Sequence, residues 1–294
     1  MRGIALPDIR MKYEKVRKKI NLSTYGQKRA QGKGSEWAST EPAKGVSSKL
    51  CLIPFPEKSM SLHLSHTSQS VIEEIDARVA SQHLLQHPFY QAWSRGELSM
   101  DALRDYATQY YHHVVAFPTY LSAVHAQTEN AEVRRQILSN LIDEEAGSPN
   151  HPELWLEFAE SLGLNRAEVK NAAQWPETKK LIEDFRSCCC ERGTGVGLSA
   201  LYAYESQIPA VSEKKIEGLK AYYGFSNPDS YKYFSVHIEA DREHAAVEAA
   251  QIAQLVDDTQ RAAALEAAGE VLADLYGLLS AVCDRHGIET ACVH

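Results

Sequence analysis

The chain has 294 residues, of which 44% are hydrophobic, and its formal net charge is −8. This length and apolar content are sufficient for one large domain with a sizeable core. No apolar run approaches the length of a membrane span, and no apolar stretch near the N-terminus is typical of a secretory signal, which disfavours the membrane and secreted classes.

Residues 1–59 differ in composition from the rest of the chain. They contain 13 Lys and Arg against 5 Asp and Glu, whereas residues 60–294 contain 18 against 34, together with all twelve histidines. The first segment also lacks apolar periodicity. We therefore predict a disordered basic tail, or an upstream extension of a gene whose functional start is Met60, followed by one domain over residues 60–294. A basic arm can bind nucleic acid, but no basic motif with interleaved aromatic residues supports such binding here.

From about residue 68 the chain has the apolar periodicity of helices. Ser99 is a typical N-cap for the long segment that follows it, and Pro118 is expected to kink that helix. Alternating runs of β-branched residues are nearly absent, so strands are not expected. The expected helical segments are 70–85, 99–127, 130–147, 151–164, 176–193, 196–224, 227–255 and 259–287. Together they predict an all-α fold, a single bundle of seven or eight helices.

Two adjacent acids, Glu144 and Glu145, lie near the end of the segment 130–147. Both face apolar residues at helical spacing, so periodicity does not choose between them. His151 follows Glu144 by seven residues, about two turns if the helix continued. Pro149 interrupts that helix, so the spacing alone only suggests a pair of metal ligands.

Three adjacent cysteines, Cys188, Cys189 and Cys190, are half of the six in the chain. Neighbours of this kind make a poor disulfide framework, and no C-x2-C spacing indicates a zinc site. We therefore expect a reduced, cytoplasmic compartment.

Glu205 lies in the apolar stretch LSALYAYESQIP. Its neighbours at helical spacing are Leu198, Leu201, Tyr202 and Ile208. An unpaired buried glutamate is costly, so this side chain needs a cation or a proton. The plain alternative is a core glutamate that is protonated or paired with an arginine.

The stretch HIEADREHA, residues 237–245, places His237, Asp241 and His244 on one narrow stripe of a helix, given about 100° per residue. The same stripe continues into Tyr233 and Phe234, which indicates that it faces inward. The alternative is a polar helix that happens to carry histidines. With the acids above, three carboxylates and three imidazoles on three segments are sufficient to hold two metal ions. The candidate ligands are Glu144, His151, Glu205, His237, Asp241 and His244.

Four motifs within about residues 70–260 carry a family resemblance: HPFYQAW (87–93), DEEAGSPNHPELW (143–155), YESQIP (204–209) and HIEADREH (237–244). As a set they resemble the haem-oxygenase-like diiron oxidases, which share the PqqC/TenA-like fold. Within these they resemble the CADD family, that of the chlamydial protein associating with death domains. The resemblance implies a dimetal centre, iron or mixed iron and manganese, that uses molecular oxygen and an external reductant. It also implies synthesis of 4-aminobenzoate, a folate precursor, by a homodimer.

The resemblance further implies that the product is built from a tyrosine of the chain itself, with nitrogen supplied by a lysine. The matching residues are Tyr90 and Lys215, with Lys214 adjacent to the latter. Tyr204 and Tyr233 flank metal ligands and are candidates either to relay a radical or to hydrogen-bond to the ligands. This interpretation requires no external aromatic substrate, nucleic acid or membrane. The sequence by itself favours ordinary packing for Tyr90 and a solvated side chain for Lys215.

Three other functions compete with this one. A diiron oxygenase acting on an external small amine, amino acid or fatty acid would use the same ligands. A thiaminase-like hydrolase on the same fold would need a cysteine nucleophile in its pocket. A non-enzymatic interaction protein would need an exposed docking face in place of six inward ligands.

Overall fold

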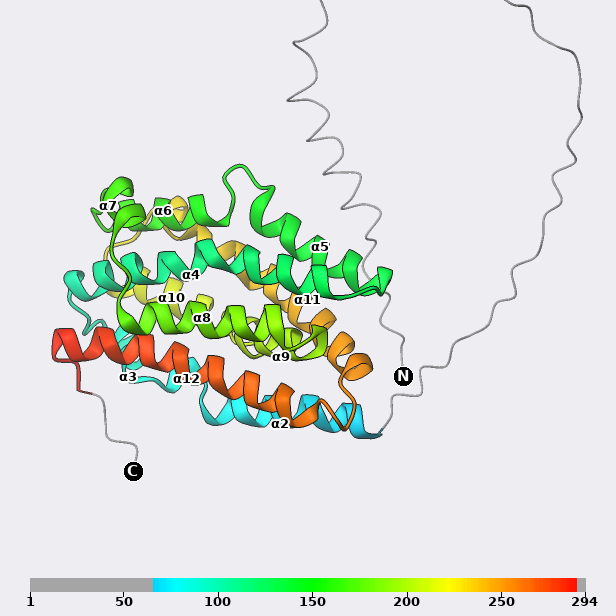
Figure 1. Ribbon diagram of the computed structural model, residues 1–294. Helices are drawn as coiled ribbons and strands as arrows, with labels where there is room; N and C mark the ends of the chain where they lie inside the picture. The colour runs from blue at the N-terminus through cyan, green and yellow to red at the C-terminus, as the bar shows by residue number, and fades with distance from the viewer. Residues whose placement is uncertain (1–65, 290–294) are drawn as a thin grey trace, which may run out of the picture. The chain divides into compact units, whose positions relative to one another are not determined.

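The computed structural model describes residues 66–289, with side chains from Val71 onward. Every regular element in this range is a helix, so the predicted all-α fold is confirmed (Figure 1). No helix in this range combines the length and the apolar content that a membrane span requires. The predictions made for residues 1–59 lie outside the described residues.

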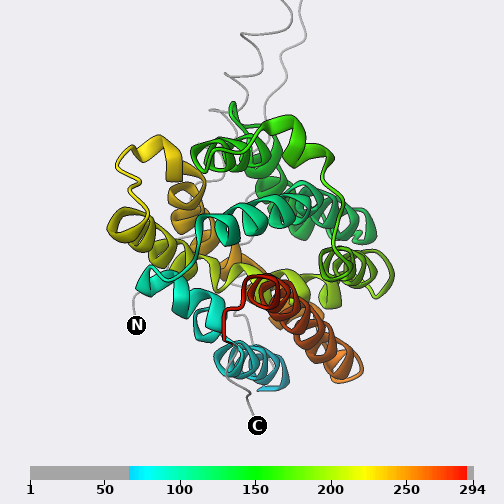
Figure 2. The same ribbon diagram turned by 90° about the vertical axis from the view of Figure 1, so that its left-hand side faces the viewer.

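The helices follow one another through short connections. In chain order they are α2 (His66–Ser81), the 3-10 helix η1 (Leu84–Gln86), α3 (Pro88–Arg95), α4 (Met100–Gln127), α5 (Ala131–Glu145), α6 (His151–Ser161), α7 (Arg166–Asn171), α8 (Pro176–Glu191), α9 (Thr194–Glu205), α10 (Ile208–Tyr222), η2 (Pro228–Tyr231), α11 (Lys232–Leu255) and α12 (Arg261–His286). In both views α2 and α12 lie together on one side of the bundle, and α6 lies on the other side (Figures 1 and 2).

The helix boundaries differ from the prediction at one important place. The segment 196–224, expected to be one helix, is two helices, α9 and α10, separated by Ser206 and Gln207. Pro209 explains the break, because its ring would clash with the carbonyl of Glu205 and it has no amide hydrogen to donate. With the short helices α3 and α7, the bundle therefore has more helices than the seven or eight predicted. By contrast, α4 begins after the predicted N-cap Ser99 and runs through Pro118 as one helix.

Helix α9 is the central element of the bundle. All of its residues from Gly195 to Glu205 are buried, and it packs against α8, α11 and α12. A helix that is apolar on every side is typical of such a position. The carboxylate at its C-terminal end, Glu205, is thereby carried into the interior.

Helices α3 and α10 approach each other closely at Gly218. A Cβ atom there would lie only 2.6 Å from Cδ1 of the buried Trp93, so no larger residue fits without movement. The indole Nε1 of Trp93 also donates a hydrogen bond of 3.2 Å to the backbone oxygen of Lys215. These contacts bring Tyr90 on α3 and Lys215 on α10 into the same interior region.

Candidate metal centre

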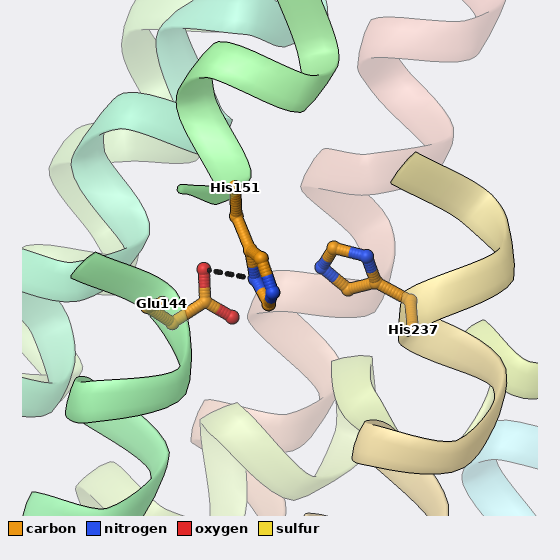
Figure 3. A group of neighbouring side chains, drawn as sticks. All are labelled: Glu144, His151 and His237. Atoms are coloured by element: carbon orange, nitrogen blue, oxygen red, sulfur yellow. Dashed lines mark ion pairs between the residues drawn. The ribbon is translucent and has the colours of Figure 1, made fainter. Parts of the chain in front are cut away.

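The first group of candidate ligands forms where α5 ends and α6 begins. Glu144 lies in the last turn of α5 and His151 is the first residue of α6, next to its N-cap Asn150. The Nδ1 atom of His151 lies 2.8 Å from Oε2 of Glu144. His237 of α11 completes the group, and Figure 3 shows the three side chains pointing toward one another. Their ligand atoms lie within 4.8 Å of one another, a spacing that one metal ion can bridge.

The orientation of His237 is set by the backbone of its own helix. Nδ1 of His237 donates a hydrogen bond of 2.6 Å to the carbonyl oxygen of Tyr233, because a carbonyl can only accept. Nε2 is therefore the nitrogen that keeps a lone pair. Burial, and then the neighbouring His151, lower the pKa of His237. Neutral imidazole, with one nitrogen anchored and the other available, is the form that binds a metal ion.

The second group joins the end of α9 to the middle of α11. Nδ1 of His244 lies 3.6 Å from a carboxylate oxygen of Glu205 and 3.6 Å from one of Asp241. All three side chains are buried, and their ligand atoms also lie within 4.8 Å of one another. Burial is the main cause that raises the pKa of Asp241 to about 7. The two carboxylates thus share one buried imidazole as their nearby source of positive charge.

Two buried atoms of the second group, Oδ2 of Asp241 and Nδ1 of His244, have no hydrogen-bond partner within residues 71–289. Unsatisfied buried polar atoms are costly and rare in folded proteins. A cation bound in the second group would satisfy both atoms, and a cation in each group would offset the charge of the crowded carboxylates. Oxygen and imidazole nitrogen are also the donors that iron and manganese accept. The donor set therefore fits two metal ions.

A small cavity lies beside both groups. Its walls are Val114, Phe117, Glu144, Tyr204, Glu205, Tyr233, His237 and Asp241. Tyr204 and Tyr233 are buried tyrosines in this wall, and the hydroxyl of Tyr204 lies 2.8 Å from that of Tyr110. A small molecule bound in this cavity would contact the candidate ligands and two phenols at once.

A second polar site lies in an aromatic chamber around Lys215. The amine of Lys215 is buried, and within residues 71–289 no carboxylate forms an ion pair with it. It donates a hydrogen bond of 2.7 Å to the hydroxyl of Tyr106 and lies 5.5 Å from the centre of the Tyr90 ring. Burial lowers the pKa of Lys215 to about 7. A substantial part of this amine is therefore neutral and nucleophilic near pH 7.

Lys214 is different in every one of these respects. Its side chain is half exposed and forms an ion pair of 2.6 Å with Glu217. The sequence left open which of the two lysines is special, and the structure places only Lys215 beside Tyr90.

A family of proteins described as iron-containing redox enzymes matches residues 104–276. The chain belongs to this family. The resemblance inferred from the motifs is thereby confirmed. Two relatives, both named 4-aminobenzoate synthase, come from Chlamydia pneumoniae and Nitrosomonas europaea. The first is 46% identical over 72% of this chain and 94% of its own length, and the second is 42% identical over 75% and 94%.

Two solved structures share the fold of this chain. A TenA homologue from Pseudomonas syringae superposes with a TM-score of 0.63 at 18% identity, covering 74% of this chain and 92% of its own. A CADD-like protein of unknown function from Nostoc punctiforme superposes with a TM-score of 0.62 at 18% identity, covering 76% and 100%. At these identities the two structures support the haem-oxygenase-like fold alone.

The site contains three further polar residues that the sequence did not single out. Asn140 donates a hydrogen bond of 3.0 Å to Glu205, and Asp143 lies 3.3 Å from Nε2 of His244. Glu248 is buried one turn after His244, and burial, followed by the charge of Glu205, raises its pKa well above its ordinary value. The spacing of Glu248 continues the stripe of ligands and was visible in the sequence. Asn140 and Asp143 gave no comparable signal.

The burial of individual side chains decides two questions that the sequence left open: which of two adjacent glutamates belongs to the cluster, and whether the cysteine trio lies at the site. Glu144 is buried whereas Glu145 is exposed, so only Glu144 belongs to the cluster. Cys188 and Cys189 are buried and Cys190 is exposed, and none of them lines the cavity beside the candidate ligands. A thiaminase-like role for the cysteine trio therefore has no support from its position.

Proposed function

We propose that this protein is a 4-aminobenzoate synthase that converts its own Tyr90 into the product, with the nitrogen of Lys215. The first part rests on the relatives of that name, which align with nearly three quarters of this chain. The second part rests on one observation, the buried amine of Lys215, which forms no ion pair within residues 71–289 and lies 5.5 Å from the centre of the Tyr90 ring. Burying an amine without a carboxylate partner is costly, and a chemical role for the amine would account for that cost.

The two groups of candidate ligands differ in composition. Glu144, His151 and His237 offer one carboxylate and two imidazoles, whereas Glu205, Asp241 and His244 offer two carboxylates and one imidazole. Imidazole suits iron, and carboxylate oxygen suits manganese. The donors thus support a dinuclear iron centre or, better, a mixed centre of iron and manganese. When bound, such a centre supplies the activation of dioxygen, with electrons from an external reductant.

A line of phenols joins the cavity to the chamber. Tyr204 in the cavity wall lies 2.8 Å, hydroxyl to hydroxyl, from Tyr110, whose ring centre lies 5.3 Å from that of Tyr106. The Tyr106 hydroxyl in turn lies 3.3 Å from that of Tyr90. Burial raises the pKa of all four phenols, so each keeps its proton near pH 7. Oxidation of any of them must therefore be coupled to loss of that proton.

The carbon skeleton of the product fits a tyrosine origin. The ring and Cβ of Tyr90 supply all seven carbon atoms of 4-aminobenzoate, with dioxygen oxidising Cβ to the carboxylate. The Cα–Cβ bond breaks, and the phenol oxygen leaves as water when the Lys215 nitrogen forms a C–N bond to the ring. Dioxygen then oxidises the N–Cε bond of the lysine to an imine, and hydrolysis of that imine leaves an aldehyde at Cε and releases the nitrogen with the ring. No external aromatic substrate is required, and a chain reacts once.

The experiment that tests this proposal uses protein grown with ring-labelled tyrosine and 15N-labelled lysine. After incubation with iron, manganese, a reductant and dioxygen, the 4-aminobenzoate is analysed by mass spectrometry. We expect both labels in the product, at no more than one molecule per chain, and a matching loss of mass from the protein. Unlabelled product in many equivalents per chain would contradict a self-derived origin.

A second candidate function is oxygenation of an external small molecule. A surface groove lined by Tyr202, Ser206, Pro209, Ala210, Glu213, Asp241, Arg242, Ala245, Ala246 and Ala249 favours it. This groove and the inner cavity share Asp241, so a ligand in the groove would lie next to a candidate metal ligand. The labelling experiment separates the two functions, because an external substrate would give repeated turnover and no protein-derived label.

A further inference from the structure

Tyr106 of α4 is the residue that connects Lys215 to Tyr90. Its side chain is fully buried, and its hydroxyl accepts a hydrogen bond of 2.7 Å from the Lys215 amine. The same hydroxyl lies 3.3 Å from the hydroxyl of Tyr90. Within residues 71–289 no other side chain hydrogen-bonds to both of these groups. The two residues in the proposed nitrogen transfer therefore meet through one phenol.

The other contacts of the Lys215 amine are with aromatic rings and do little to orient its nitrogen. Besides Tyr90 and Tyr106, the rings of Phe234, Tyr110 and Trp155 lie within 5.8 Å, measured from Nζ to ring centre. Such rings attract a cation, but they do not orient a neutral amine. Within residues 71–289 the Lys215 nitrogen makes one hydrogen bond, to Tyr106, and a hydrogen bond is a directional contact. Tyr106 is thus the directional restraint on the amine.

We propose that Tyr106 is a positioning residue that holds the Lys215 nitrogen beside the Tyr90 ring for nitrogen transfer. This inference rests on the proposed function and names a residue that the motifs did not include. Its physical basis is proximity, since holding two reacting groups in the right geometry can contribute several powers of ten to a rate. Without the hydroxyl, the amine keeps its aromatic chamber but has no partner that directs it toward Tyr90.

The Tyr106 ring also has a packing role, which must be separated from the role of its hydroxyl. The ring contacts Phe89, Trp93, Tyr110 and Trp155. The substitution Tyr106→Phe keeps these ring contacts and removes only the oxygen. Tyr120→Phe is a matched control, because Tyr120 lies on the same helix, is equally buried, and has a hydroxyl without a hydrogen-bond partner.

The test compares the wild type, Tyr106→Phe and Tyr120→Phe as metal-loaded full-length chains grown with labelled tyrosine and lysine. After reaction with reductant and dioxygen, peptide mass spectrometry measures how much of residue 90 and of residue 215 has been consumed. In the wild type and in Tyr120→Phe we expect equal consumption of the two. In Tyr106→Phe we expect residue 90 still to be oxidised, Lys215 to stay intact, and labelled product to fall at least tenfold, at unchanged metal content.

The other outcomes overturn the proposal in distinguishable ways. Equal consumption of both residues at wild-type yield in Tyr106→Phe would show that the hydroxyl is dispensable. A parallel fall in the consumption of both would show that Tyr106 acts in the oxidation of Tyr90 or in packing, and not in positioning the amine. If the wild type itself released unlabelled product, the proposed function would fail, and the role of Tyr106 would fail with it.

Discussion

The candidate metal centre and the chamber around Lys215 are both buried, but charge is treated differently in the two regions. In the candidate metal centre, carboxylates and imidazoles from α5, α6, α9 and α11 face one another, and two of their atoms have no hydrogen-bond partner within residues 71–289. In the chamber, one amine is surrounded by aromatic rings, and its pKa is lowered to about 7. The first region needs added positive charge, whereas the second avoids charge by losing a proton. This difference supports the proposed metal-binding role of the first region and the proposed nucleophilic role of the second.

The largest expected effect comes from removing ligands of the metal centre. We predict that Glu205→Ala/His244→Ala loses at least one of two bound metal ions and all 4-aminobenzoate synthesis, because metal–ligand bonds are lost and Asp241 is left without its imidazole neighbour. Metal analysis of the purified protein measures this. The exposed Glu145→Ala is the control and should keep both ions. Retention of two equivalents by the double variant would refute the ligand assignment.

Removing the hydroxyl of Tyr90 should abolish product synthesis without affecting metal binding, so the contributions of the two regions can be measured separately. We expect Tyr90→Phe to bind metal like the wild type but to release no 4-aminobenzoate, because phenylalanine has no ionisable hydroxyl for oxidation. Metal content and product are measured on the same sample. Tyr222→Phe, a change of the same size at an exposed position, should leave both unaffected. Product from the Tyr90 variant at wild-type yield would make Tyr90 a structural residue.

The buried amine of Lys215 should make the free energy of unfolding depend on pH. Because burial lowers the folded-state pKa of Lys215 from 10.5 to about 7, the unfolded chain binds more protons between these two values. The free energy of unfolding should therefore gain from this group as pH rises through that window, by up to ~1.4 kcal/mol per pH unit. Below about pH 7 both states hold the proton, and the full cost of burying the charge is present.

Lys215→Met should remove this contribution. We expect the variant to be more stable than the wild type at pH 7 by about 1 kcal/mol or more, with the difference shrinking at pH 9, while product synthesis is lost. Denaturant unfolding at the two pH values measures it. Lys214→Met, at an exposed position, should keep the wild-type dependence on pH. An unchanged slope in the Lys215 variant would mean that the amine is solvated.

The smallest effect on product synthesis is expected where α3 meets α10. In Gly218→Ala the added Cβ meets Trp93, and the two helices must separate slightly, so we predict a loss of ~1–3 kcal/mol in unfolding free energy. Product should fall several-fold as Tyr90 and Lys215 move apart, at unchanged metal content. Gly277→Ala is the control, because an added Cβ there meets no atom within 4 Å. Equal product from both variants would show that this contact does not set the geometry of the chamber.

The two regions also differ in how much of them could be predicted from the sequence. His237, Asp241 and His244 share one helix, so the helical repeat alone placed them on one face. Glu205 stood out because an acid on an apolar helix is unusual. The choice of Glu144 over Glu145 required the tertiary structure, since both have apolar neighbours along their own helix.

No spacing or unusual residue within a single helix predicted the chamber around Lys215. Tyr90 and Tyr106 come from the consecutive helices α3 and α4, but Lys215 lies more than 100 residues further along the chain, and the hydrogen bonds of the three depend on how their helices pack. Family resemblance supplied Tyr90 and Lys215, but nothing in the pattern indicated Tyr106. The break between α9 and α10, by contrast, was within reach, because Pro209 is a recognisable helix breaker.

The position of Tyr90 within the core has a consequence for the lifetime of the protein. Its ring is 2% exposed and packs against Phe89 and Trp93 on the short helix α3. A chain that has given up this ring would lose about 3–5 kcal/mol, the usual cost of deleting a large aromatic side chain, from a typical total of only 5–15. Spent molecules would unfold more often than fresh ones and would be degraded first by cellular proteases. Because each chain would react once, new product would require newly made protein, and the supply of product would follow the rate of protein synthesis.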